Sequence, residues 1–250
     1  MERVRNLDEQ RKGVMAIIIM TKYKFFCCPD YYCLVLGLLF ASNILAQEIK
    51  TVQDFETWSS VGLQYKPIDR LNIELEEQVR LKNNSQTLDE YFTQLSLSYE
   101  LSNHFELSGA YRWITMSKKE DGVSVNESAN RYHLGVVYKH DIKRATFAYR
   151  LRYQNKSFSD SDSSNKQFVR FKTRVKYNIK NWKLDPIASA ELFREIGGEF
   201  RNFRMTLATD YRIKNIGNIK VFYRFIKELN QSNPKSTSIV GLSFIHKLNF

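Results

Sequence analysis

Ser236–Phe250 has the sequence STSIVGLSFIHKLNF, and its pattern sets the interpretation of the rest of the chain. Counting back from Phe250 in steps of two gives one face that is apolar except for its histidine: Leu248, His246, Phe244, Leu242 and Val240. The intervening positions are mixed and more polar. A period of two is typical of a β-strand whose two faces meet different environments. The stretch therefore predicts a strand with one apolar side.

This strand ends on an aromatic residue, and its pattern resembles the C-terminal insertion signal of Gram-negative outer-membrane β-barrels. The positions that carry the resemblance are Leu242, Phe244, Leu248 and Phe250. The resemblance implies a location in outer-membrane lipid and recognition of the strand by the barrel-assembly machinery.

The composition of the 250 residues agrees with one-sided strands. The chain has a net charge of +11, 14 Tyr and 17 Phe. Its mean hydropathy of −0.44 is too low for a helical membrane protein. Many aromatic residues at low mean hydropathy suit strands that are apolar on one face only.

The one long apolar run lies near the start of the chain. Tyr31–Ala46 is YYCLVLGLLFASNILA, and it follows Lys22 and Lys24. A basic segment, a short apolar core and a small residue before the cut predict a secretory signal peptide that is cleaved after Ala46. We therefore expect a signal peptide at 1–46, with Met15 or Met20 as an alternative start, and a barrel domain at 47–250.

All three cysteines lie in the predicted signal peptide, at positions 27, 28 and 33. A lipoprotein anchor is the alternative interpretation, but it requires a cysteine at the cleavage point. The predicted mature chain has no cysteine, which excludes disulfides, thiolate metal sites and a cysteine nucleophile.

From Gln47 onward, segments of about 10–14 residues alternate between apolar and polar positions. These segments are Glu56–Lys66, Arg70–Lys82, Tyr91–Leu101, His104–Thr115, Arg131–Asp141, Arg144–Asn155, Phe168–Ile179, Lys183–Arg194, Phe203–Ile213, Ile219–Asn230 and the final strand. A secreted soluble β-domain would also alternate. The length of the segments, the tyrosines near their ends and the two targeting features favour an all-β, antiparallel, up-and-down transmembrane β-barrel.

Connections between the segments alternate between short turns and longer polar stretches. The longer ones are 83–90, 117–130, 156–167, 195–202 and 231–235. Eleven strands would leave the start of the first strand outside the cell, and bacterial single-chain barrels have an even strand number. We therefore expect about twelve strands, with Gln47–Phe55 as a short extra crossing, and ten strands as the alternative. Glu77 is an exception to the alternation, because it falls on an apolar position.

The order of polar landmarks resembles the domain-of-unknown-function 2490 family of small predicted outer-membrane barrels. The landmarks are Glu76-x-x-x-Arg80, Gly109-x-Tyr111-Arg112, Arg150-x-Arg152, Arg170 to Arg174, Glu191-x-Phe193 and Arg201-Asn202-Phe203-Arg204. This resemblance supports the fold and the location across the mature chain, and it implies no activity.

The polar faces of the predicted strands would line the barrel lumen, and their basic residues cluster on two successive segments. We take as candidate pore-lining residues Arg150, Arg152, Arg170, Lys172, Arg174 and Lys176. One hypothesis is a narrow channel that favours small acidic solutes, because fixed positive charge concentrates anions. The alternative is a non-conducting structural or binding barrel whose inward charges pair with one another.

An outer-membrane lipid hydrolase is a third class of function. His133 points inward and Ser96, Ser98 and Ser108 lie on nearby inward faces, yet no spacing singles out a nucleophile. We therefore expect no enzyme activity, and we find no phosphate loop, cofactor motif or metal-ligand cluster. A nucleic-acid partner is also not expected, since the basic residues alternate with apolar ones in an exported chain.

Overall fold

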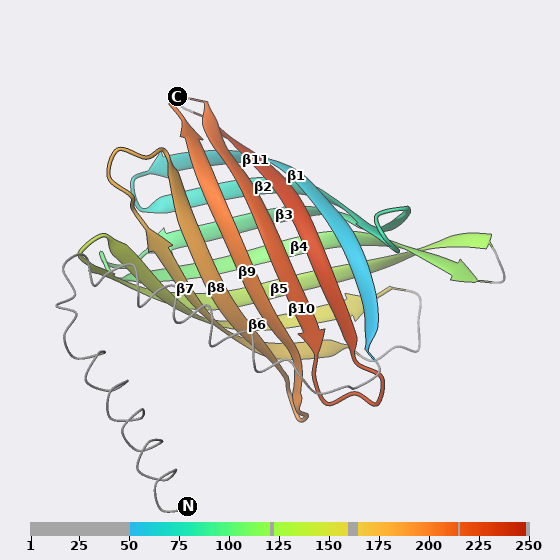
Figure 1. The fold of residues 1–250 in the computed structure, drawn as a ribbon. Helices are drawn as coiled ribbons and strands as arrows, with labels where there is room; N and C mark the ends of the chain where they lie inside the picture. Colours follow the sequence, from blue (N-terminus) through green and yellow to red (C-terminus); the bar gives the residue numbers. More distant parts are fainter. Residues whose placement is uncertain (1–50, 121–122, 160–164, 215, 249–250) are drawn as a thin grey trace, which may run out of the picture. The chain divides into compact units, whose positions relative to one another are not determined.

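The computed structural model describes residues 51–120, 123–159, 165–214 and 216–248, and they form one closed β-barrel (Figure 1). The strands are β1 (Val52–Ile68), β2 (Leu71–Lys82), β3 (Thr87–Glu100), β4 (Phe105–Glu120), β5 (Val123–Ile142), β6 (Ala145–Phe158), β7 (Lys166–Tyr177), β8 (Leu184–Glu195), β9 (Phe200–Ile213), β10 (Gly217–Glu228) and β11 (Lys235–Leu248). No helix in this part of the chain is long and apolar enough to cross a membrane. The expected all-β barrel is confirmed, while the predicted signal peptide and Phe250 lie outside the described residues.

Each strand pairs in antiparallel fashion with the next, and the barrel is closed by a parallel pair, β1 with β11. We call this pair the seam. Its register runs from Val52 opposite Lys235 to Tyr65 opposite Leu248. In an up-and-down barrel with an odd number of strands, the first and last strands point the same way, so a parallel seam is the geometric consequence of eleven strands.

The expected strand number of twelve, or alternatively ten, is wrong for the described residues. Val52–Phe55 do not form a separate crossing, because they are the first residues of β1, which continues to Ile68 without interruption. The weak segment around Pro186 is also a strand. Pro186 pairs with Thr209 on β9, and the pairing of β7 with β8 ends one residue away at Ile187, so the missing N–H of proline breaks no ladder on that side.

The two faces of the sheet have opposite character, as the alternation predicts. Outward side chains are mostly apolar and exposed, and Leu134 is 62% exposed. Inward positions hold most of the buried polar and charged residues, including Gln94 and His133. The barrel is therefore inverted relative to a soluble one, which would bury its apolar face.

Aromatic side chains gather on the outer surface near one end of the barrel. The rings of Phe105 and Tyr138 are 5.1 Å apart, and the rings of His140 and Phe147 are stacked at 5.3 Å. The ring of Tyr149 also stacks with that of His140, at 5.7 Å. Girdles of this kind are typical of the interfacial zones of membrane barrels.

The two ends of the barrel differ in their connections. We call one the turn end, where the connections are 69–70, 101–104, 143–144, 178–183 and 214–216. The other is the loop end, where they are 83–86, 121–122, 159–165, 196–199 and 229–234. The prediction that 117–130 forms a long polar loop is wrong, since β4 and β5 continue as a paired hairpin there, from Ser117 opposite Asn126 to Glu120 opposite Val123. This hairpin projects beyond the other strands (Figure 1).

Glu77 faces outward without any irregularity in β2. It lies opposite Val61 on β1 and opposite Thr93 on β3 in a continuous register, so no bulge accommodates it. Instead, the hydroxyl of Thr93 donates a hydrogen bond of 2.6 Å to the Glu77 carboxylate. The outer surface thus carries one acidic side chain between the exposed Leu75 and Val79.

Candidate functional site: the cationic lumen

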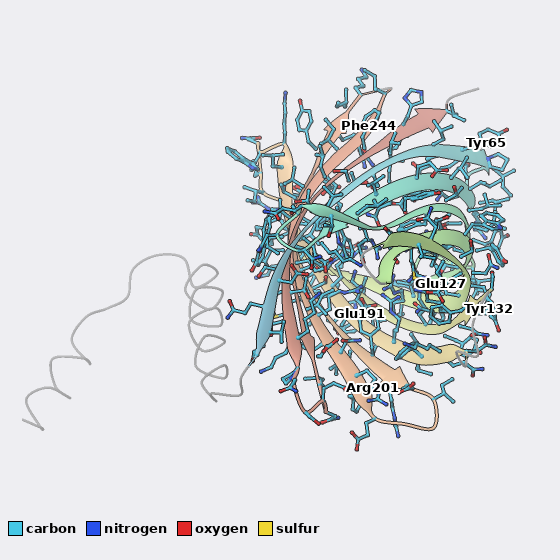
Figure 2. All side chains as sticks on the ribbon, turned by 90° about the vertical axis from the view of Figure 1, so that its right-hand side faces the viewer. Tyr65, Glu127, Tyr132, Glu191, Arg201 and Phe244 are labelled. Atoms are coloured by element: carbon cyan, nitrogen blue, oxygen red, sulfur yellow. The ribbon has the colours of Figure 1, made fainter. Side chains whose placement is uncertain are left out.

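A cavity of about 270 Å³ lies within the barrel, and its wall is strongly basic. Ten of its 21 lining residues are Arg or Lys and two are Glu. The basic residues are Arg80, Arg112, Arg131, Arg150, Arg152, Arg170, Lys172, Arg204, Lys220 and Arg224. In Figure 2, Glu191 lies within the ring of strands, whereas Tyr65 and Tyr132 lie at its outer edge. We call this space the central cavity.

Glu191 on β8 is the counter-ion for one side of the central cavity. Its Oε1 accepts hydrogen bonds from Arg150 Nη2 at 2.7 Å and from Arg170 Nη2 at 2.9 Å. Its Oε2 accepts a longer one, 3.4 Å, from Arg204 Nη1. In the strand register Glu191 lies between Lys172 on β7 and Arg204 on β9, and it is only 3% exposed. A single carboxylate therefore sits at the centre of three guanidinium groups.

Inward aromatic rings support the arginines. The guanidinium carbon of Arg80 lies 3.6 Å from the centre of the Trp58 ring, and that of Arg112 lies 3.3 Å from the centre of the Phe92 ring. Arg170 lies at 4.3 Å over Phe193. Cation–π contacts fix the plane of a guanidinium while leaving its N–H groups at the ring edge free to donate. These ring contacts therefore restrict the conformations of the arginine side chains in the lumen.

On the neighbouring strands β4, β5 and β6, the cavity wall has arginines without a bound carboxylate. Arg112 on β4 lies directly opposite Arg131 on β5, and its Nε donates to Gln94 at 2.9 Å. Arg152 on β6 lies directly opposite Arg170 on β7. Like charges that face each other across neighbouring strands are destabilising. This wall therefore concentrates positive charge at a cost in stability.

The two apolar clusters inside the lumen lie toward the loop end. One joins Trp58, Phe222 and Ile239 across the seam. The other contains Phe92 and Ile114, with the neighbouring residues Ala129, Met116 and Phe158. These clusters narrow the space next to the central cavity.

At the turn end the lumen charges are paired instead. Lys176 Nζ lies 3.2 Å from Asp185 Oδ2 and 3.1 Å from Asp210 Oδ2. Lys139 forms an ion pair with Glu106. A second cavity of about 210 Å³ lies beside this pair, and Arg174 lines it. The smaller cavity is also lined by more basic than acidic residues, but its Lys139 is paired with Glu106.

The candidate pore-lining residues line both cavities, and Arg150 and Lys172 contribute to each of them. Arg150, Arg152, Arg170 and Lys172 line the central cavity. Arg174 lines the smaller cavity near the turn end, and Lys176 is neutralised by two aspartates.

The clustering of basic residues in the sequence predicts a cationic wall on β6 and β7. The structure draws its residues also from β2, β4, β5, β9 and β10. The inward aromatic residues were missed altogether, although Phe92 falls on the polar positions of β3, between Glu90 and Gln94. An aromatic residue among the polar positions of a strand, such as Phe92, is the sequence signal that would have predicted these inward rings.

The predicted insertion-signal residues face outward. Leu242 is 51% exposed, and Phe244 and Leu248 are partly buried on the same face of β11. Phe244 lies opposite Val61 on β1, so this face continues across the seam.

Two solved structures share the barrel architecture at low similarity. The β domain of the Bordetella autotransporter Brka is 11% identical, with a TM-score of 0.42, over 66% of this chain and 78% of that one. An anion-selective porin from Comamonas acidovorans is 9% identical, with a TM-score of 0.35, over 71% of this chain and 53% of the porin. These values are too low to transfer a function. Comparison with curated proteins finds no match.

A family model matches most of the barrel. It covers residues 55–237, from the first strand to the beginning of the last, and its description is "Protein of unknown function (DUF2490)". The family resemblance predicted from the sequence landmarks is thereby confirmed. The chain belongs to the DUF2490 family, whose description names no activity.

Proposed function

We propose that this protein is an outer-membrane β-barrel whose lumen favours the passage of small anions. The observation that carries the proposal is the imbalance of charge around the central cavity, ten basic residues against two carboxylates. Fixed positive charge in a narrow, low-dielectric passage raises the local concentration of anions and repels cations. The small size of the cavity favours small acidic solutes over larger ones.

The membrane part of this proposal is supported by the outer surface. Strands of 12–20 residues are long enough to cross a bilayer at a tilt, and the residues they expose are largely apolar. Outer-membrane lipid is then the partner of this surface. In the same proposal, the exported chain loses its signal peptide, and the barrel-assembly machinery inserts it through the strand that contains Leu242 and Phe244.

The test is electrical. Protein purified from outer membranes is reconstituted in a planar bilayer, and single-channel conductance and the reversal potential in a salt gradient are recorded. We expect discrete steps with an anion-selective reversal potential, and we expect Lys172→Gln and Arg152→Gln to reduce that selectivity. Arg194→Gln is the matched control, because Arg194 is exposed on the outer face of β8. A cation-selective potential, or selectivity unchanged in both lumen variants, would overturn the proposal.

A second candidate function is a non-conducting barrel, and the inward apolar clusters favour it. Phe92 and Ile239 are at most 1% exposed although both face the lumen. If a correctly folded, heat-modifiable protein gives no current steps, the passage is closed and the barrel has a binding or structural role. Enlarging the lumen with Phe92→Ala would then be expected to produce steps.

We propose no catalytic role for the lumen. His133 is 7% exposed in the wall of the central cavity, but it forms no hydrogen bond with a serine or a carboxylate among the described residues. Ser108 instead bonds to the backbone carbonyl of Gly135. The absence of lipid-hydrolysing activity in the purified protein would agree with this, and loss of such an activity in His133→Ala would contradict it.

A further inference from the structure

The Glu191 carboxylate shows how arginines of this lumen bind an oxyanion, so it can be compared with the rest of the cavity wall. Glu191 Oε1 receives donors from Arg150 and Arg170 within 3 Å, and the carboxylate is almost fully buried. Charge-assisted bonds between guanidinium and carboxylate are among the strongest polar contacts in proteins. The lumen therefore uses convergent arginines to hold an oxyanion, and the oxyanion on this side belongs to the chain.

The wall formed by Arg112, Arg131 and Arg152 contains the same kind of donors without such a partner. Arg112 Nη1, Arg131 Nε and Arg152 Nε are buried and donate to no acceptor among the described residues. A buried donor without an acceptor is unfavourable, and a charged one more so. Arg112, Arg131 and Arg152 stand on adjacent strands β4, β5 and β6, and all three residues line the central cavity. Arg150 Nε and Arg204 Nε are also buried without an acceptor in the described part of the chain, but other nitrogens of these two arginines bond to Glu191.

The other carboxylate of the cavity, Glu76, forms no direct ion pair with this wall among the described residues. Glu76 lines the cavity from β2, but within the described part of the chain it forms no ion pair with an arginine or lysine within 4.0 Å. Glu90 is close to the same region and is bound to Arg80. Glu76 and Glu90 act on Arg112 and Arg131, and Glu191 acts on Arg152, but none of them forms a direct ion pair with these arginines. The cations of the wall outnumber these carboxylates, so a bound anion would supply negative charge that the wall lacks.

We infer that Arg112, Arg131 and Arg152 form a binding site for a small multivalent oxyanion, a compound with carboxylate or phosphate groups. The planar fork of a guanidinium matches both groups, and chloride cannot use it in the same bidentate way. This inference names the ligand class of the passage proposed above and rests on that proposal for the ligand's route to the cavity.

The size of the cavity limits the ligand further. A cavity of about 270 Å³ has room for several water molecules and therefore for a compound of comparable size. A citrate-sized or pyrophosphate-sized anion is compatible with this volume, and a lipid or an oligosaccharide is not. Multiple negative charges on a small compound also suit a wall with several cations and few acids.

The experiment measures equilibrium binding, which requires no current. Calorimetric titrations of the purified full-length protein in neutral detergent use pyrophosphate and citrate as probes, with sodium chloride of equal ionic strength as the reference. We expect saturable binding of at least one probe and none of chloride. A preference for pyrophosphate or for citrate tells phosphate from carboxylate ligands.

Variants test which arginines bind the probe. Removing one charged donor in Arg131→Gln or Arg152→Gln is expected to weaken binding by about tenfold or more. Arg131→Lys keeps the charge but loses the fork, so it should weaken binding as well. Arg194→Gln on the outer face should change the affinity less than twofold, because salt screens the interaction between a distant exposed charge and the ligand. Heat-modifiable migration on gels confirms that each variant is folded.

The outcomes separate this inference from the proposed function. Equal affinities in Arg131→Gln, Arg152→Gln and the control, or no saturable binding in the folded wild type, would overturn the oxyanion site. Anion-selective current with no saturable binding would overturn the site alone. Saturable binding that depends on Arg131 and Arg152 without any current would support the site and overturn only the passage.

Discussion

Lys235 on β11 holds Asp54 on β1 across the seam, with 2.9 Å between Lys235 Nζ and Asp54 Oδ2. The same ammonium lies 3.8 Å from Glu56 Oε1, and Glu56 accepts a 2.9 Å hydrogen bond from the indole N–H of Trp58. The loop end of the seam is therefore fastened by side chains as well as by the backbone ladder. Two of the predictions below concern these contacts.

Reversing one charge at the seam should weaken it. Asp54→Lys places two ammonium groups together, and we expect a loss of about 1 kcal/mol in the free energy of unfolding, since Lys235 is partly exposed. The exchange variant Asp54→Lys/Lys235→Asp should recover most of the loss. Urea unfolding in detergent measures both. An exchange variant that is as unstable as the single one would show that the pair itself does not stabilise the seam.

Truncating Trp58 should destabilise the barrel far more. Trp58 is 5% exposed and packs edge-on against Phe222, with ring centres 6.5 Å apart. Large-to-small changes at such sites cost about 3–5 kcal/mol, so Trp58→Ala should lower the unfolding midpoint strongly. Trp113→Ala is the matched control, because Trp113 is 49% exposed on the outer face. Similar losses of stability in both variants would contradict a special role for the apolar cluster of Trp58, Phe222 and Ile239.

Gly241 leaves space for an aromatic ring. A Cβ at this position would lie 2.1 Å from Cζ of Phe222, so the ring packs directly on the glycine backbone. We expect Gly241→Ala to cost about 1–3 kcal/mol by overpacking. Removing the ring in Gly241→Ala/Phe222→Leu should reduce the cost attributable to Gly241, whereas Gly198→Ala at a loop-end turn should be nearly neutral. Additive effects of the two lumen changes would rule out the steric explanation.

Glu77 should lower the stability of the barrel in lipid. Its carboxylate faces outward between Leu75 and Val79, and an outward charge in the apolar band of a membrane barrel is unfavourable. We expect Glu77→Leu to stabilise the protein in lipid vesicles by up to about 2 kcal/mol and to have less effect in detergent. Reversible unfolding in both media provides the comparison. A destabilised Glu77→Leu variant in lipid would indicate that the Thr93 hydrogen bond or a protein partner requires the acid.

Single cysteines can establish which end faces the cell exterior. The described residues contain no cysteine, so Gln86→Cys at the loop end and Asn103→Cys at the turn end each provide the single thiol of the barrel. Both positions are exposed. A membrane-impermeant maleimide on intact cells should label Gln86→Cys and should label Asn103→Cys only after the outer membrane is permeabilised. The reverse pattern would invert the orientation of the barrel.

The sequence was sufficient to assign strands and faces, because the two-residue period is a local property. Arg170 and Lys172 were both expected inside, and both line the central cavity. The two-residue period is not sufficient to predict which inward residues of different strands meet in the central cavity. The meeting of Arg112 with Arg152 in one cavity depends on the stagger between β4, β5 and β6, which no single strand encodes.

Two wrong expectations have physical causes that lie outside the pattern. The polar character of 117–130 predicts a loop, yet a hairpin that projects beyond its neighbours has no need of an apolar face to remain paired. The strand number was derived from an even-number rule for antiparallel closure. That rule does not apply to a seam formed in parallel, from Val52 beside Lys235 to Tyr65 beside Leu248.

The parallel seam also determines where the barrel can be extended. β1 begins at the loop end and β11 finishes at the turn end, so the chain enters the first strand at one end of the barrel and leaves the last strand at the other end. If the loop end faces the cell exterior, as the labelling experiment above tests, an epitope inserted between Thr51 and Val52 would be accessible to antibodies on whole cells. With the same orientation, one fused after Leu248 would face the periplasm. A single chain of this kind therefore offers two attachment points on the two faces of one membrane, which a barrel with an even number of strands does not.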